Sequence, residues 1–268
     1  MGRKLIVNAD DFGFTCDVNQ GILDAHREGI LTATTLMATE FIASGDAFFD
    51  AIRIANETPT LDVGVHLVLV GSPGFPASIP ALISAVARKR IKAYDEFAKQ
   101  VRRVRDWGIS PTHLDTHKHT HLLPAVLDAV ARVSQEFKIP WVRRPFDFPM
   151  QPGSAGIVKS LTAHAMSSMS GRFERVLTAH GCKSTDHFAG FKITGNYNAR
   201  DLAALIRALP EGSTEFMCHP GRCSDELRAA KTRLKESREA ELRALCSTQV
   251  REALDQSGVE LVSYRDLN

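Results

Sequence analysis

Histidines and a carboxylate alternate with other residues in one short stretch of the sequence. His113, Asp115, His117, His119 and His121 fall within nine consecutive residues. If this stretch is extended, side chains two residues apart point the same way, so all five would share one side. Imidazole and carboxylate groups are the usual protein ligands of several divalent metal ions. The spacing therefore indicates a metal site, and it leaves open which of the four histidines are ligands.

Carboxylates and imidazoles also stand where strand-like runs end or are interrupted. Asp10 and Asp11 end an apolar run, His66 interrupts another, and His219 precedes a Pro-Gly turn. A buried imidazole needs a partner or a ligand, because burying a polar group alone costs free energy. Because successive strand side chains point opposite ways, we expect one aspartate on the metal and the other free to act as a general base. His187 is a further candidate for the pocket.

Together these groups predict hydrolysis assisted by a metal ion. A divalent cation held by a carboxylate and two or more imidazoles keeps positions open for water and substrate, lowers the pKa of bound water and polarises a carbonyl group. Those effects serve the hydrolysis of an amide or an ester near neutral pH. A histidine at the position of His219 could protonate the leaving group.

The elements that must position these residues alternate between short strand-like runs and longer helical patterns, which is typical of a mostly parallel sheet with crossover helices. The predicted strands cover 4–9, 32–37, 61–70, 141–144, 186–191, 215–218 and 259–264. The predicted helices cover 44–56, 95–107, 125–137, 158–169, 201–209 and 226–254, with one more between Asp17 and Gly29.

Seven or eight strands in this order favour an α/β fold of the (β/α)-barrel type over an open nucleotide-binding sheet, since no G-x-G-x-x-G or P-loop follows a strand. Barrel enzymes keep their catalytic groups at the carboxyl ends of the strands, where Asp10 and Asp11 stand. We expect the many Lys, Arg and Glu residues of 226–254 to form a solvated outer face.

The composition sets limits on the class of protein. The 268 residues are 44% hydrophobic and 24% charged, which excludes a disordered or fibrous chain, and a net charge of +2 implies no nucleic-acid partner. No apolar run approaches the roughly 20 residues of a membrane span, so we expect a cytoplasmic protein without stable membrane insertion. Five cysteines without a C-x-x-C pair predict free thiols, and the lack of a linker predicts a single domain over 1–268.

Five motifs, in this order, carry a resemblance to a known family. They are NADDFG at 8–13, GVHLVL at 64–69, THLDTHKHTH at 112–121, TDHFAGF at 185–191 and MCHPG at 217–221. The chain resembles the YdjC family of carbohydrate deacetylases, which includes the chitooligosaccharide deacetylases of the ChbG type and the hopanoid-associated HpnK proteins. The resemblance implies a distorted TIM-like barrel that removes an N-acetyl group from an amino sugar with a divalent metal ion. Carboxylate and imidazole ligands suit Mg, Mn, Fe, Co or Zn, and we expect one ion, Mg or Zn.

The resemblance also implies roles for individual residues. The metal ligands would be Asp11, His66 and His117, and the choice of His117 among the clustered histidines rests on the resemblance alone. Asp10 would be the base and His219 the acid. Substrate contacts are expected from three further residues, namely Asp115, Arg144 and His187. In the segment WVRRP at 141–145 either Arg143 or Arg144 could meet sugar hydroxyls. The short segment GSPGFPASIP after His66 leaves the size of the sugar open.

Three alternatives use the same residues. The first is a metal-dependent hydrolase of a non-sugar amide or a phosphoester, because the same activated water attacks other electrophiles. The second is a non-haem iron oxygenase, which has the same ligand types but usually an antiparallel double-sheet fold. The third is a metal-bearing sugar-binding protein, which would lack the acid or the base, whereas Asp10 and His219 are both present. The expected partners are an N-acetylated sugar and, from base rates, a second copy in a homodimer.

Overall fold

Eight parallel strands form the centre of the structure, which is a computed structural model that describes residues 2–149 and 169–267. The strand order is β5-β4-β3-β2-β1-β7-β6, and β8 pairs with the beginning of β1. The strands are β1 (Arg3–Phe12), β2 (Ala33–Met37), β3 (Asp62–Leu67), β4 (His113–Thr116), β5 (Trp141–Val142), β6 (His187–Ala189), β7 (Gly212–Cys218) and β8 (Val259–Leu261). Their common direction brings the carboxyl ends to one end of the sheet.

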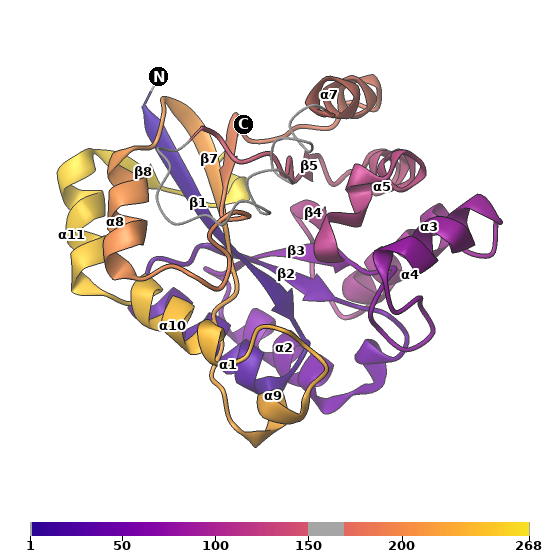
Figure 1. Ribbon diagram of the computed structural model, residues 1–268, viewed down its shortest axis with the longest axis horizontal. Helices are drawn as coiled ribbons and strands as arrows, with labels where there is room; N and C mark the ends of the chain where they lie inside the picture. The colour runs from indigo at the N-terminus through magenta and orange to yellow at the C-terminus, as the bar shows by residue number, and fades with distance from the viewer. Residues whose placement is uncertain (1, 150–168, 268) are drawn as a thin grey trace.

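Helices connect the strands and cover the outside of the curled sheet (Figure 1). They are α1 (Cys16–Glu28), α2 (Asp46–Glu57), α3 (Ile79–Ala87), α4 (Ala93–Asp106), α5 (Pro124–Phe137), α7 (Ser170–Ala179), α8 (Ala199–Arg207), α9 (Asp225–Ala229), α10 (Glu236–Leu245) and α11 (Thr248–Ser257). Three short 3₁₀ helices are η1 (Ile42–Ser44), η2 (His117–Leu122) and η3 (Tyr264–Asp266).

The two edges of the sheet approach each other without a full strand pair. Isolated parallel bridges join Trp141 to Lys183 and Asp147 to Phe188. The Val142 amide donates to the Lys183 carbonyl at 2.8 Å, within this contact. The sheet is therefore curled into an incompletely closed barrel, which confirms the predicted distorted (β/α) barrel.

Strand β1 is the longest strand, and its end is irregular. It pairs with β7 on one side, and with β8 and then β2 on the other. The register with β2 shifts between Ala9 and Phe12, and Asp11 has a φ of 69°. Such a bulge redirects side chains at the end of a strand. Asp10 and Asp11 both line the same cavity, but only Asp11 belongs to the group of donor atoms with His66 and His117.

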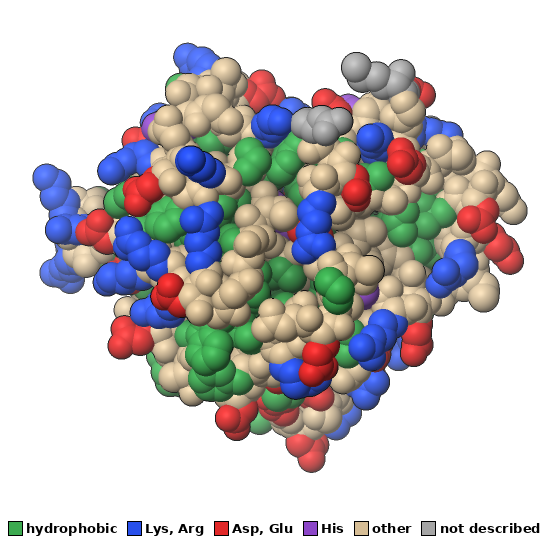
Figure 2. All heavy atoms as spheres, turned by 180° about the vertical axis from the view of Figure 1, so that it is seen from behind, with side chains coloured by type: hydrophobic (Ala, Val, Ile, Leu, Met, Phe, Trp, Pro, Cys, Tyr) green, Lys and Arg blue, Asp and Glu red, His purple; other side chains and the backbone are tan. Residues whose placement is uncertain are grey.

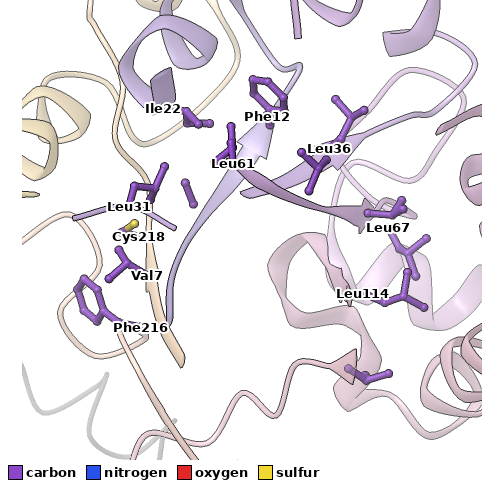
Figure 3. Packing of buried hydrophobic residues seen from close by; sticks show 14 of the residues in the cluster. Val7, Phe12, Ile22, Leu31, Leu36, Leu61, Leu67, Leu114, Phe216 and Cys218 are labelled. Carbon is purple, nitrogen blue, oxygen red and sulfur yellow. The ribbon is translucent and has the colours of Figure 1, made fainter. Parts of the chain in front are cut away.

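The core lies between the sheet and its surrounding helices. Side chains from β1, β3, β4 and β7, among them Val7, Leu67, Leu114 and Phe216, belong to one buried cluster (Figure 3). Ile22 of α1 joins the same cluster. Strands buried on both faces are typical of a sheet whose connections are helices, and they hold their carboxyl ends rigidly for a site.

The surface carries charges of both signs. Figure 2 shows basic and acidic side chains interspersed over one face of the molecule, with hydrophobic side chains between them. Within residues 2–149 and 169–267, no helix is both long enough and apolar enough to cross a membrane.

Several predicted elements differ from the structure. The single helix predicted over 226–254 is wrong, because the chain forms α9, α10 and α11 there. This segment contains no Gly or Pro, and the one local signal of a break is Ser247, whose side chain caps the start of α11. Two helices, α3 and α7, were not predicted. The helix predicted over 158–169 lies almost entirely outside the described residues.

Gly64 in β3 allows β4 to lie close enough to complete the site. A Cβ at this position would lie 2.5 Å from the carbonyl oxygen of His113 and 2.7 Å from its ring. We therefore expect Gly64→Ala to lower the free energy of unfolding by about 1–3 kcal/mol, because overpacking a dense core forces side chains and backbone to shift. Urea denaturation measures this change. Gly171→Ala is the control, since its Cβ would meet no atom within 4 Å in α7; an equal loss of stability in both variants would contradict the packing explanation.

Candidate active site

Three side chains converge where β1, β3 and β4 end. They are Asp11 near the end of β1, His66 near the end of β3, and His117 directly after β4. His66 Nε2 lies 3.5 Å from Asp11 Oδ1, and His117 Nδ1 lies 3.3 Å from the same oxygen. The two imidazole nitrogens are 3.2 Å apart. One carboxylate oxygen and two nitrogens thus form a small triangle of donor atoms.

This triangle fits one divalent metal ion. Ligand atoms that lie about 2.0–2.2 Å from a common ion at tetrahedral or octahedral angles are about 3.0–3.5 Å from one another. The three separations fall in that range. The types of donor, two imidazoles and a carboxylate, suit several divalent transition metals and leave coordination positions for water or substrate. The three residues expected to hold the metal are therefore brought together.

Asp115 lies behind His66. Its Oδ1 is 2.7 Å from His66 Nδ1, and its Oδ2 accepts a hydrogen bond from the Thr35 hydroxyl at 3.1 Å. This contact directs His66 Nε2 toward the donor triangle, as a carboxylate commonly does for a metal-binding histidine. Asp115 is fully buried and is not among the residues lining the cavity. Its position suits orientation of His66, and it does not offer the substrate contact expected from the sequence.

The buried carboxylates change the protonation of His66. Burial lowers the pKa of its imidazole, but Asp115, Asp10 and Asp11 together outweigh burial and raise the pKa to about 9. In the absence of a metal ion, His66 therefore carries a proton at neutral pH.

The histidine-rich stretch turns sharply after β4. The strand ends at Thr116, and Lys118 and His119 have φ values of 55° and 52°. This turn presents His117 Nδ1 to the donor triangle, whereas His119 forms part of the cavity wall. The stretch is therefore not extended beyond the strand.

The other two histidines of the stretch have structural contacts. The ring of His113 stacks on Tyr264 with centroids 4.0 Å apart. His121 Nε2 lies 3.1 Å from the Arg143 carbonyl oxygen. The five alternating residues thus do not share one side, and the prediction that depended on an extended stretch is wrong.

Asp10 is held by a buried arginine. Arg143 Nη1 and Nη2 donate to the two oxygens of Asp10 at 2.8 and 2.6 Å. Arg143 also contacts the Asp115 and Glu215 carboxylates, at 2.7 Å each. Burial raises the pKa of Asp10, but the Arg143 guanidinium, together with His66 and His219, outweighs burial and holds the pKa well below its usual range, so the carboxylate is ionised.

Arg144 and His187 lie away from this arrangement. Arg144 pairs with the Glu174 carboxylate at 3.1 Å near the surface. His187 begins β6, and its Nε2 lies 3.1 Å from the Glu211 carbonyl oxygen. Neither is among the residues that line the cavity. The arginine that reaches the site is the preceding residue, Arg143, which directly follows β5.

His219 lies beside Asp10. Its Nε2 is 3.8 Å from Asp10 Oδ2, and its backbone amide donates to Glu241 Oε2 at 2.6 Å. Its Nδ1 is buried and has no hydrogen-bond partner among the residues that the structure describes. Burial lowers the pKa of the imidazole, although Asp10 and Glu241 partly offset this. His219 is therefore mainly neutral at pH 7.

A cavity of about 750 Å³ connects these groups to the outside. Its volume lies in the range of small-molecule sites. Asp10, Asp11, His117 and His219 line it together with apolar side chains, among them Phe14, Met37, Phe41, Ile42, Val70 and Phe191.

Arg238 of α10 also lines this cavity, and it donates to Asp11. Sequence analysis missed it, because nothing in the charge pattern of 226–254 distinguishes it from its exposed neighbours.

Comparison with known proteins places the chain in a family. A family model described as "YdjC-like protein" matches residues 4–256. A carbohydrate deacetylase of Brevibacillus brevis is 30% identical over 98% of this chain and 99% of its own length. A chitooligosaccharide deacetylase of Enterobacter sp. strain 638 is 31% identical over the full length of both chains.

A solved structure shares the fold. A crystal structure from Enterococcus faecalis V583, provisionally named a cellobiose-phosphate cleavage protein, is 24% identical with a TM-score of 0.76, over 100% of this chain and 99% of that one. Since the family model covers nearly the whole sequence and a relative that is 30% identical aligns end to end, the chain belongs to the YdjC-like family.

Proposed function

We propose that this protein hydrolyses the N-acetyl group of an amino sugar with one divalent cation held by Asp11, His66 and His117. The observation that carries the proposal is the donor triangle, with Asp10 and His219 lining the same cavity. The names of the relatives, carbohydrate deacetylase and chitooligosaccharide deacetylase, support the choice of substrate. Two imidazoles among three ligands suit Zn²⁺ better than Mg²⁺, and both remain candidates.

A divalent cation at the triangle would lower the pKa of a water molecule and polarise the amide carbonyl. The residues of this chain handle the protons. Asp10 is ionised, and each of its oxygens keeps a lone pair beyond the bond to Arg143, so it can accept a proton from the attacking water. His219 then delivers a proton to the amine nitrogen as the C–N bond breaks.

The neutral state of His219 determines the order of these steps. An imidazole that starts neutral must gain a proton before it can act as an acid. Asp10 Oδ2 is only 3.8 Å from His219 Nε2, so a small movement allows the proton taken from water to pass from the carboxylate to the imidazole. The water supplies its hydroxyl group to the acyl carbon, which gives acetic acid, and its other proton to the amine nitrogen.

Acetate release with and without metal tests the function. We expect chelated protein to release no acetate from diacetylchitobiose or N-acetylglucosamine, and Zn²⁺ or Mg²⁺ to restore the release, because the donor triangle alone cannot activate water. An enzymatic acetate assay measures it. A phosphomonoester and a non-sugar acetamide are run in parallel; turnover of either of these with no acetate from both sugars would reject the proposed substrate.

Removing a ligand and removing the base should have different effects. We expect His117→Ala to lose at least tenfold in metal affinity together with activity, because one of three donors is gone. Asp10→Asn should keep the metal and lose about 10²–10⁴-fold in kcat. Metal content and acetate release are measured on the same preparations, with His180→Ala as control, since His180 contacts Gln135 near the surface. Full turnover by folded Asp10→Asn protein would remove Asp10 from its role.

Metal binding should displace a proton. The pKa of His66 is about 9 without metal, and its Nε2 faces the donor triangle. At pH 7 a cation must therefore compete with this proton, so apparent affinity should rise with pH, by up to tenfold per unit, and level off near pH 9. Calorimetry in two buffers of different ionisation enthalpy counts the protons released. Binding at pH 7 without proton release would show that His66 is already neutral.

A further inference from the structure

Arg238 is one of the largest fully buried side chains of the described residues, although it belongs to a strongly charged helix. It lies in α10, which packs against α1 and α8 (Figure 1), and its relative exposure is 1%. Burying a guanidinium costs several kcal/mol unless its donors find acceptors. We therefore expect Arg238 to be paired with a buried acidic group.

The partner of Arg238 is the proposed metal ligand Asp11. Arg238 Nη2 donates to Asp11 Oδ2 at 2.5 Å, and Nε donates to the Leu234 carbonyl oxygen at 3.3 Å. Because Oδ2 is occupied by the guanidinium, Oδ1 is the oxygen that faces His66 and His117. The arginine thus determines which oxygen of Asp11 reaches the donor triangle.

The backbone at Asp11 makes such an anchor necessary. Asp11 has a φ of 69°, a conformation that a residue other than glycine adopts at some cost. It also lies within the register shift between Ala9 and Phe12, so no regular pairing with β2 fixes its orientation. A charged hydrogen bond from a second element holds a side chain that the strand itself does not.

The Pro-Gly turn after His219 makes room for this arginine. A Cβ on Gly221 would lie 3.1 Å from Arg238 Cδ and 3.2 Å from its Cβ. The Gly221 amide donates to the Arg238 carbonyl at 3.3 Å. Gly221 also packs on Gly21 of α1, where a Cβ would come within 2.3 Å of the Gly221 Cα. Two glycines therefore allow α10 to approach the end of β1.

From this geometry we infer that Arg238 is a positioning residue of the metal site, which orients Asp11 so that Oδ1 completes the donor triangle with His66 and His117. The inference rests on the metal site of the proposed function, but it does not depend on which substrate is hydrolysed. The proposed ligands all lie in the first half of the chain, whereas Arg238 lies in its last third. The inference therefore gives the last third of the chain a role in metal binding.

Metal affinity tests the inference without substrate. The apoprotein is titrated with Zn²⁺ against a chelating dye, and its unfolding is followed in parallel. We expect Arg238→Met to bind Zn²⁺ about 10–100-fold more weakly than the wild type, which is the usual effect of losing a group that orients a ligand. An increase in Zn²⁺ affinity is the opposite result. It is expected if Arg238 acts only through its charge, because removing a positive charge near a cation without any loss of orientation would strengthen binding.

Three further variants separate positioning from general stability. Arg238→Lys keeps the charge but has a single donor group, and we expect an intermediate loss of affinity. Arg243→Met removes an exposed arginine of the same helix, and Glu241→Gln weakens another buried contact of that helix, the one with the His219 amide. Both should leave Zn²⁺ affinity within about threefold of the wild type, because neither residue touches a ligand.

The outcomes separate this inference from the proposed function. Folded Arg238→Met protein that binds Zn²⁺ as tightly as the wild type, or more tightly, would overturn the inference while leaving deacetylation intact. An equal loss in Glu241→Gln would also overturn it, since α10 would then act only through stability. Wild-type protein that binds Zn²⁺ but releases no acetate would reject the function alone. If Arg238→Met does not fold, unchanged affinity in Arg238→Lys decides against the inference.

Discussion

Two neighbouring carboxylates end the central strand of this protein, and each is held by its own buried arginine. Asp10 is paired with Arg143, and Asp11 with Arg238. Two like charges side by side in a buried place would otherwise raise each other's pKa and favour protonation. The guanidinium groups lower the pKa of both carboxyls instead. The remaining features of the site depend on these carboxylates being ionised and fixed in direction.

The charges around the strand ends leave a place for a cation. Asp115 and Glu215 join Asp10 in the buried network around Arg143, so carboxylates outnumber guanidiniums there. A second group of three donors, made of Asp10, His66 and Asp115, also exists. The Arg143 guanidinium already contacts both of its carboxylates, so this second group needs no ion. The triangle at Asp11 is the one whose donor set suits a divalent metal.

The curled sheet explains how distant segments meet. Strands β1, β2, β3 and β4 are successive neighbours in the sheet. The two histidine ligands, from the ends of β3 and β4, therefore lie on one side of β1, which carries Asp11. Strand β7 pairs with β1 on its other side and ends just before His219. The arrangement thus places the proposed acid and base on the β7 side of the ligands. A regular open sheet would keep these strand ends farther apart.

Much of the site could be predicted from the sequence. Asp10 and Asp11 end one apolar run and His66 interrupts another, and such polar groups in buried strands need a partner or a ligand. The order of strands and helices predicts a barrel with its site at the carboxyl ends of the strands. These features are local, because a strand pattern and a polar interruption are both read from a few neighbouring residues. The turn after Thr116 could not be predicted from neighbouring residues, because Lys118 and His119 have positive φ values, which residues other than glycine rarely adopt.

Only the tertiary structure decided which arginines enter the site. Arg143 and Arg144 are adjacent and chemically identical, and Arg238 belongs to a segment in which most charges are solvated. What distinguishes them is burial beside a carboxylate from a distant strand: Asp10 is 133 residues from Arg143, and Asp11 is 227 residues from Arg238. A pairing over such separations depends on how the chain packs. The sequence by itself therefore determined the strand ends and the clustered candidate ligands, among which the family resemblance singled out His117. Packing determined which two arginines hold the carboxylates of Asp10 and Asp11.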